Sequence, residues 1–558
     1  MSNSRSKSID PRLSSSAIMR NLPLVLLLVV VVLGPVALRP RTEKAAEPGE
    51  RSLVVVSPHN EAIRSEFGRA FAKHYLSKHG QRVRLDWRTP GGTSEIARYV
   101  AAEYLTSFQN HWTQTLKMPW AAAVERSFDN PRVELDATPD DDTLEQRARR
   151  AFLDSNVTCR IDLFFGGGSP DFISQAAAGR LVDSGVIAAH PELFGDHGIP
   201  QKVSGEPYWD PQGRWIGTCV SAFGICYNVD ALQRIGAAPP TRWEDLTDPR
   251  YFRGIALANP TQSSSVNRSF EMVIQQQMHA AVERRTAAGA GVTTPADEEL
   301  AGVREGWLRG LQIIQRIGAN ARYFTDASSK VALDVQAGDA AAGMTIDFFG
   351  RFQAEAVQRA DGTSRLHYGD VPGGSSFNAD PIGMFRGAPN REIAREFIQF
   401  VISPEGQKLW NFKVGTPGGP GRYALRRLPI LPALYEPEFQ PFRSDPGVAP
   451  YELAKGFAYR EKWTGPVFKP LAFVIRVMCI DTHDELRNAW RALIDANFPP
   501  EATAVFSDLS AVDHTTASGR IKEAFGSIKI KEVQLAKELS DRFRTQYRRA
   551  TELAQAGR

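Results

Sequence analysis

The sequence predicts an α/β fold made of two lobes, preceded by a membrane-entry segment and followed by a helical extension. Short apolar runs rich in β-branched residues alternate with amphipathic helical patterns, which is typical of a largely parallel sheet. The chain has 558 residues, more than one hydrophobic core usually serves. Two lobes are therefore expected.

The composition argues against several classes of partner. The chain has 67 basic and 63 acidic residues, a net charge of +4, so it offers no large field of one sign to nucleic acid. Four cysteines, Cys159, Cys219, Cys226 and Cys479, match no zinc spacing and are too few for a dense disulfide framework. Cys219 and Cys226 either pair in an oxidising compartment or remain core thiols, and we favour thiols. We expect no cofactor.

Residues 22–38 form an uncharged apolar run. As a helix this run would be roughly 26 Å long, slightly short of the ~30 Å hydrocarbon core of a bilayer. Basic residues in the preceding tail, residues 1–21, predict that this end stays in the cytoplasm and that the body lies outside. The run is either a cleaved signal peptide or an uncleaved anchor. We favour the anchor because no clear small-x-small cleavage site follows, and a lipoprotein is excluded because no cysteine lies nearby.

After a linker over residues 39–51, the body repeats a pattern of strand, polar loop and helix. Predicted strands over residues 53–56, 83–87, 161–165 and 255–258 each run into a loop rich in polar residues or glycine. Helices are predicted over 61–78, 95–104 and from residue 171. The candidate ligand-binding residues in the loops are Ser57, His59, Asn60, Thr93, Ser94, Gly168, Ser169, Ser263, Ser264 and Ser265.

Such loops meet at one place in an open α/β sheet, the crevice outside the carboxyl ends of its strands. Helix starts behind the loops offer free backbone N–H groups and a partial positive charge. A small anionic or polyhydroxylated solute suits this crevice. The alternative is that Thr93, Ser94 and the serines are ordinary helix N-caps.

Several stretches in order along the chain resemble one protein family. They are residues 56–61, 162–168, 221–228, 243–246, 343–350 and 397–410. The chain is similar over residues 52–425 to the extracellular solute-binding proteins of ABC importers, in the iron(III)-type group of the type II periplasmic binding fold.

This resemblance implies a clamshell that holds a solute between two lobes and delivers it to the permease and ATPase subunits of an ABC importer. It implies a first lobe over residues 52–222 and 347–425 and a second over 223–346. The crossings are expected near residues 221–227 and 345–349, so Ser221 and Asp347 join the candidate ligand-binding residues. Asp347 would either accept hydroxyl groups of a solute or anchor the crossing segment.

Ferric-binding members of this family commonly use adjacent tyrosines with a histidine and a glutamate. At the position that looks equivalent, this chain has Asp347, Phe348 and Phe349, and phenylalanine has no oxygen to donate. His59 and Glu61 remain as ferric ligands, which is a poor set for hard Fe(III). We therefore expect an organic anion, such as a sugar phosphate, phosphonate or carboxylate, with ferric iron as the alternative.

Three segments go beyond the family core. In the insertion over residues 108–150, Trp112 and Trp120 either line a widened cleft or pack under a longer helix. Residues 283–304 are expected to form a polar surface excursion. The helical extension over residues 426–558 either wraps the first lobe or contacts a partner protein.

The motifs of common enzyme classes are missing. The glycine-rich loops lack the Lys-Ser/Thr of a P-loop, and the chain has neither a Gly-x-Ser-x-Gly nor a His-Glu-x-x-His motif. The sequence therefore predicts an extracytoplasmic solute-binding protein that is not an enzyme, tethered through residues 22–38 or secreted. A membrane-anchored ligand sensor of the same architecture is the rival hypothesis.

Overall fold

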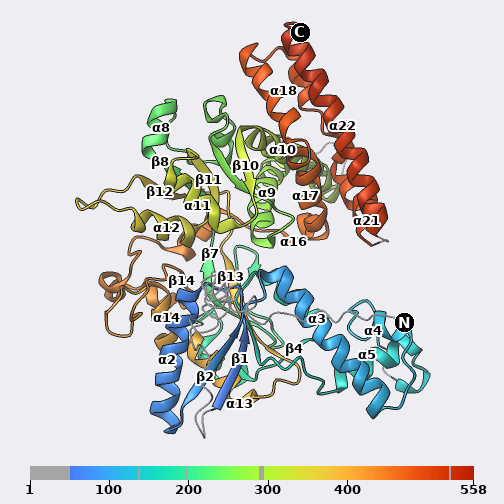
Figure 1. The fold of residues 1–558 in the computed structure, drawn as a ribbon, viewed down its shortest axis with the longest axis vertical. Coiled ribbons are helices and arrows are strands. Elements are labelled where there is room, and N and C mark those ends of the chain that lie inside the picture. Colours follow the sequence, from blue (N-terminus) through green and yellow to red (C-terminus); the bar gives the residue numbers. More distant parts are fainter. Residues whose placement is uncertain (1–50, 136–137, 197, 288–293, 527–528) are drawn as a thin grey trace, which may run out of the picture. The chain divides into compact units, whose positions relative to one another are not determined.

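The computed structural model describes residues 51–135, 138–196, 198–287, 294–526 and 529–558. The predicted membrane-entry segment over residues 22–38, its basic tail and residues 39–50 of the linker lie outside these ranges. From β1 onward the chain forms one compact unit that contains two main sheets, and each sheet is the frame of one lobe (Figure 1).

The first sheet, which defines lobe 1, is mixed. Its strand order is β14-β7-β13-β3-β1-β2. Strand β4 lies outside this order and pairs with β13. Strands β1 and β3 are parallel, whereas β13 is antiparallel to both β3 and β7. The strands are β1 (Arg51–Val56), β2 (Val83–Arg88), β3 (Leu163–Phe165), β4 (Leu181–Val182), β7 (Ile216–Ser221), β13 (Asn378–Phe385) and β14 (Leu428–Pro429).

Lobe 1 contains several helices before the C-terminal extension begins, and the first of them shows why they form. Asn60 caps α2 by accepting a hydrogen bond from the Ile63 amide at 3.1 Å, and Gly80 ends the helix in the left-handed conformation. The helix buries one apolar face. The helices are α2 (Glu61–His79), α3 (Thr93–Asn110), α4 (Ala122–Ser127), α5 (Leu144–Asp154), α6 (Ser169–Ala177), α7 (Val186–Ala189), α13 (Arg391–Ile402) and α14 (Pro404–Asn411).

The second sheet, which defines lobe 2, has the strand order β10-β9-β11-β8-β12. Its strands are β8 (Phe223–Asn228), β9 (Ile255–Ala258), β10 (Ala321–Thr325), β11 (Ala342–Ile346) and β12 (Leu366–Asp370). The helices between them are α8 (Val229–Ile235), α9 (Ser264–Ala287), α10 (Pro295–Asn320), α11 (Ser328–Ala337) and α12 (Asp347–Ala356).

The chain crosses between the lobes at places that differ in part from the expectation. It first crosses at Ala222, between β7 of lobe 1 and β8 of lobe 2. Strand β12 pairs with β8 in antiparallel register, so lobe 2 continues to Asp370 rather than ending at residue 346. The return crossing is residues 371–377, which lead into β13. The second expected crossing, near residues 345–349, is instead the junction of β11 and α12 within lobe 2.

The C-terminal extension divides between the lobes. Leu431 and Leu434 pack in the core of lobe 1, whereas the helices after residue 460 share one core with lobe 2. Figure 1 shows α17 and α18 beside α9 and α10, with α22 on the outer side of α17 and α18. These helices therefore cover lobe 2 and do not wrap lobe 1. They are α16 (Glu461–Thr464), α17 (Phe468–Ile475), α18 (His483–Asp495), α19 (Pro500–Phe506), α20 (His514–Thr516), α21 (Lys522–Phe525) and α22 (Lys529–Gln555).

Within the described ranges, one helical stretch, Glu461–Ile480, is long and apolar enough to cross a membrane. Of its most apolar window, 67% is buried inside the structure, so it also fits a core helix of a folded domain.

The two inserted segments pack as parts of the fold. Phe108, Trp112, Phe128 and Phe152 form a buried aromatic cluster with ring centroids 4.8–5.8 Å apart in the contacting pairs. The aromatic residues of the first insertion thus pack beneath α3. The predicted excursion over residues 283–304 is mostly helical, because α9 and α10 extend into it from either side of undescribed residues 288–293. All four cysteines are buried free thiols.

Helices α9 and α10 approach so closely that glycine is needed on the contact face of α10. A Cβ atom at Gly310 would lie 2.7 Å from Ile274 Cδ1, and one at Gly306 would overlap the backbone of Met278. The backbone of α9 cannot move without disturbing the lobe 2 core, in which Ile274 and Met278 are fully buried.

We expect Gly306→Ala to lower the free energy of unfolding by about 1–3 kcal/mol, the usual range for overpacking a core. Gly519→Ala is the matched control, because a Cβ atom there meets no other atom. Urea denaturation of both variants measures the difference. Equal stability of the two variants would contradict this account of the helix contact.

Asp347 begins α12 beside the first crossing, and its amide donates to the Ala222 carbonyl at 3.0 Å. The carboxylate is fully buried, with Arg351 at 3.1 Å. Burial raises the pKa of Asp347 from 3.8 to about 6, against the opposing attraction of Arg351. Between these two pH values the folded protein keeps a proton that the unfolded chain has released. The contribution of Asp347 to stability therefore falls as the pH rises from 4 to 6.

We expect Asp347→Asn to remove this pH dependence. Between pH 4 and pH 7 the wild-type protein should lose up to about 3 kcal/mol of unfolding free energy relative to the variant. Chemical denaturation of both proteins at several pH values gives the difference curve, in which contributions of other carboxylates cancel. Parallel curves would show that Asp347 ionises normally in the folded protein.

Candidate ligand-binding site

A cavity of about 810 Å³ lies between the two lobes. Lobe 1 contributes the loops after β1, β2 and β3, and lobe 2 contributes the segments after β9, β10 and β11. The remaining walls come from the first crossing, from β13 and from residues 427 and 468 of the C-terminal extension. The volume lies within the range of small-molecule sites.

Five helices begin at this cavity, and residues of their first turns or caps line it: α3, α6, α9, α11 and α12. The N-cap residues of α3, α6, α11 and α12 are Gly92, Gly168, Ala327 and Ile346, and none of them makes a side-chain cap hydrogen bond. First-turn N–H groups have no partner within their own helix and carry the positive end of the helix dipole. At α12 two of these groups are already engaged, because the Asp347 amide donates to the Ala222 carbonyl at 3.0 Å and the Phe348 amide to Asp347 Oδ1 at 2.8 Å. At α6, Pro170 has no N–H group and the Asp171 amide donates to the Gly168 carbonyl at 3.0 Å. The backbone donors at the cavity therefore come chiefly from α3 in lobe 1 and α11 in lobe 2.

Hydroxyl groups from both lobes add further donors. Thr93 Oγ1 of lobe 1 lies 3.1 Å from Ser264 Oγ of lobe 2, and Ser264 Oγ also donates to Asp171 Oδ2 of lobe 1 at 3.2 Å. The lobes thus touch across the cavity through Ser264. Burial raises the pKa of Asp171, although both hydroxyl groups oppose the shift. The other lining hydroxyl residues are Ser94, Ser221, Thr261, Ser263, Ser265, Ser328 and Ser329.

A buried ionic group closes the lobe 1 side of the cavity. Asp380 of β13 pairs with Arg427 and lies 3.2 Å from His59 Nε2. Its other oxygen accepts a hydrogen bond from the Gly167 amide at 2.7 Å. Burial opposes ionisation of Asp380, but Arg427 and His59 outweigh it and hold its pKa below the ordinary value. Burial lowers the pKa of His59, so its imidazole is neutral near pH 7. Arg427 also lies over the Phe348 ring of lobe 2, 4.2 Å from its centroid.

Two glycines after β3 allow this packing. Gly166 has φ +97° and Gly167 has φ +132°, which other residues rarely adopt. A Cβ atom at Gly166 would lie 2.5 Å from the His59 ring, and one at Gly167 would lie 2.6 Å from Thr93 Cγ2. The loop therefore fixes the positions of two side chains that line the cavity.

The structure brings most, but not all, of the sequence-predicted residues to the cavity. Those that line it are His59, Thr93, Ser94, Gly168, Ser221, Ser263, Ser264 and Ser265. Four others have structural contacts outside the lining. Ser57 Oγ accepts from the His59 amide, Asn60 caps α2, and Ser169 Oγ donates to the Ala379 carbonyl. Asp347 is buried in its ion pair with Arg351.

Sequence reasoning missed several lining residues. Asp326, Ser328 and Ser329 follow β10 just as the predicted residues follow the other strands. The same pattern, a strand followed by a polar loop, would therefore have identified them. Asp380 is an acidic residue inside an otherwise apolar strand, a weaker signal. Nothing local to Arg427 distinguishes it from its neighbour Arg426.

The lining is a poor match to a ferric site. It includes no tyrosine, and Glu61 is exposed on α2 outside it. Of the three lining carboxylates, Glu95 and Asp380 already pair with Arg98 and Arg427, and Asp326 is exposed. In the part of the chain that the structure describes, no three His, Cys, Asp or Glu residues are grouped to hold a metal ion.

The chain is similar to several known proteins. Over 194 residues, 35% of this chain, it is 22% identical to the phosphoglycerate transport regulatory protein PgtC of Salmonella typhimurium. The match spans only 40% of that relative. Among solved structures, AfuA of Actinobacillus pleuropneumoniae, determined with fructose-6-phosphate, is 16% identical, with a TM-score of 0.40 over 64% of this chain and 81% of its own. Iron-bound HitA of Pseudomonas aeruginosa is 14% identical, with a TM-score of 0.44 over 76% and 99%.

The match to a protein family covers more of this chain than the match to PgtC does. Residues 121–426, more than half of the sequence, match the bacterial extracellular solute-binding proteins, a family of substrate-binding proteins that act in import outside the cytoplasm. The matched range includes β3, β7 and the whole of the lobe 2 sheet. The chain belongs to the family of bacterial extracellular solute-binding proteins.

Proposed function

We propose that this protein captures a small organic anion, such as a sugar phosphate, phosphonate or carboxylate, in the cavity between its lobes. It then delivers the anion to the permease and ATPase of an ABC importer. The observation that carries this proposal is the convergence on one cavity of helix starts without a side-chain cap, chiefly those of α3 in lobe 1 and α11 in lobe 2. A bound anion would take the place of the missing caps.

Charge pairing at the cavity supports recognition by N–H and hydroxyl groups rather than by a free cation. Arg427 pairs with Asp380, Arg98 with Glu95, and Arg268 with Glu206 and Glu271. The backbone N–H and hydroxyl groups can bind an organic anion without first removing water from a charged side chain. Three or four charge-assisted hydrogen bonds, at about 1.5–3 kcal/mol each, give roughly 5–10 kcal/mol before ordering costs. Micromolar capture needs about 8 kcal/mol.

The name of the Salmonella relative, which concerns phosphoglycerate transport, is in keeping with this ligand class. Ferric iron has weaker support, because the lining lacks a phenolate and its histidine is bound to Asp380. The interlobe contact through Ser264 supports capture by closure, since a ligand that touches Thr93 also approaches the start of α9.

A thermal-shift screen tests the ligand class directly. Sugar phosphates, phosphonates, dicarboxylates and ferric citrate are compared with the neutral sugars of the same size. We expect at least one organic anion to raise the melting temperature in a saturable way, because a ligand that binds only the folded state stabilises it. A response to ferric citrate alone, with stoichiometric iron retained after dialysis, would replace this proposal with a ferric carrier.

The double variant Thr93→Ala/Ser94→Ala should weaken binding of the anion found in the screen by at least about tenfold, the loss of one charge-assisted hydrogen bond. Thr106→Ala is the control, because Thr106 lies on the same helix but exposed and bonded to the Ala102 carbonyl. Isothermal titration calorimetry measures both. Wild-type affinity in the double variant would exclude these hydroxyl groups from the site.

Gly167→Ala should reduce anion affinity more than it reduces stability, because the added methyl group displaces Thr93 from its place beside Ser264. Gly195→Ala separates this effect from backbone strain: Gly195 also has a positive φ, +90°, but a Cβ atom there meets nothing. Titrations of both variants, with their melting temperatures, give the comparison. Equal affinity losses would mean that strain alone is responsible.

A further inference from the structure

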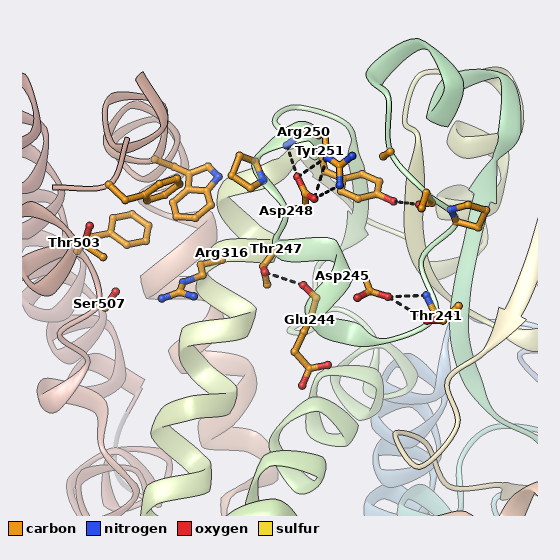
Figure 2. Close-up of a pocket in the computed structure, with 17 residues that line it drawn as sticks. Thr241, Glu244, Asp245, Thr247, Asp248, Arg250, Tyr251, Arg316, Thr503 and Ser507 are labelled. Atoms are coloured by element: carbon orange, nitrogen blue, oxygen red, sulfur yellow. Dashed lines mark hydrogen bonds and ion pairs between the residues drawn. The ribbon is translucent and has the colours of Figure 1, made fainter. Parts of the chain in front are cut away.

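A second cavity, of about 740 Å³, lies in lobe 2 where the C-terminal extension packs on it (Figure 2). One wall is the segment over residues 237–251, and the other comes from α10, α18 and α19. None of its lining residues belongs to the interlobe cavity. It is therefore a separate space, which the family core alone does not build.

The cavity holds a cation without a partner. Arg316 of α10 is partly buried, and the described residues give its guanidinium group no hydrogen bond or ion pair. Burial lowers the pKa of Arg316, and no nearby carboxylate opposes that shift. A partly buried cation with no counter-ion attracts an anion more strongly than an exposed or paired cation does.

The acidic residues of the same lining do not supply that anion, because each is engaged elsewhere. Asp248 binds Arg250 at 2.6 Å, and Asp245 accepts from the amide of Thr241 at 2.9 Å. Glu244 accepts from the Gln277 side chain at 2.6 Å. Figure 2 shows these contacts as dashed lines among Asp248, Asp245 and their partners, whereas none reaches Arg316.

Two hydroxyl groups across the cavity also lack partners. Thr503 Oγ1 of α19 and Ser507 Oγ, just beyond its end, are buried, and no group in the described chain hydrogen-bonds to either. In Figure 2 Thr503 and Ser507 lie opposite Arg316, whose side chain points toward them. Each buried hydroxyl without a partner is costly, and an acceptor held at Arg316 would relieve that cost.

An apolar wall adjoins these polar groups. The Trp490 ring lies 5.3 Å from Phe498 and 5.5 Å from Phe506, measured between centroids. The Trp490 indole N–H already donates to Asn320 at 2.8 Å, so this ring offers the cavity only apolar surface. Phe498 has φ +58°, an unfavourable conformation for a bulky residue, and it places the ring against Trp490.

We infer that this second cavity binds a small carboxylate with an apolar body, such as an aryl carboxylate. Arg316 meets the carboxylate, and Thr503 and Ser507 donate to it. Phe498 and the exposed edge of Trp490 contact the apolar body, while Phe506, fully buried, supports the Trp490 ring from behind. The guanidinium group can bind two oxygens of either a carboxylate or a phosphate, but one cation balances the single charge of a carboxylate and not the double charge of a phosphate monoester. The site is independent of the anion proposed for the interlobe cavity.

The test uses 4-fluorobenzoate as the probe with the full-length protein, followed by fluorine NMR and calorimetry. We expect saturable binding of one molecule per chain. Arg316→Gln should weaken it by at least about tenfold, the loss expected when a charge-assisted contact is removed. Arg309→Gln is the control, because Arg309 lies on the same helix but exposed and paired with Glu305 at 2.9 Å. This variant should bind as the wild type does.

Further arms identify the chemistry and the place. 4-Fluorobenzamide, the neutral isostere, and acetate, which lacks the apolar body, should each bind at least about tenfold more weakly than 4-fluorobenzoate. Thr503→Val/Ser507→Ala should weaken binding as well, and it provides a second test if Arg316→Gln does not fold. The Thr93→Ala/Ser94→Ala variant should bind the probe normally. The inference is overturned if the probe does not bind, if benzamide or acetate binds equally well, or if only the interlobe variant loses binding.

Discussion

The architecture of the interlobe site depends on the buried carboxylate of Asp380. It pairs with Arg427, contacts His59 and accepts the Gly167 amide, so it joins β13 to three segments distant in sequence. Three ionisable groups held away from water are costly unless each is compensated. Here the carboxylate is held ionised by its neighbours, and the loops after β1 and β3 are consequently fixed against the same strand. The lobe 1 side of the cavity takes its form from this arrangement.

The donors at the cavity follow from topology. Strands β1 and β3 in lobe 1, and β9, β10 and β11 in lobe 2, run parallel to one another within their sheets, so their carboxyl ends and the helix starts behind them gather at one edge. The two such edges face each other across the cavity, and Ser264 already bridges them. A solute between the lobes would therefore meet helix dipoles from both sides, which suits an anion.

Local sequence patterns were sufficient for the parts of the fold that local interactions determine. Strands β1 and β9 contain continuous apolar runs, and α2 has buried residues four positions apart and a clear cap at each end. The loops containing Thr93 and Ser264 follow directly from the strands before them, β2 and β9. The end of lobe 2 was not predictable, since β12 contains His367, Tyr368 and Asp370 and lacks an apolar run, so only its pairing with β8 identifies it as a strand. Arg427 was missed for the same reason: its role comes from Asp380, 47 positions earlier in the printed sequence. The packing of the last helices on lobe 2 likewise depends on long-range contacts.

Neither lobe is a continuous stretch of chain, and this bears on how the protein attains its native state. The core of lobe 1 joins Leu53 to Leu434, and the core of lobe 2 joins Phe223 to Ala554. During synthesis, therefore, neither core can close until segments hundreds of residues apart have both emerged. Premature collapse would leave apolar surfaces exposed, which favours aggregation.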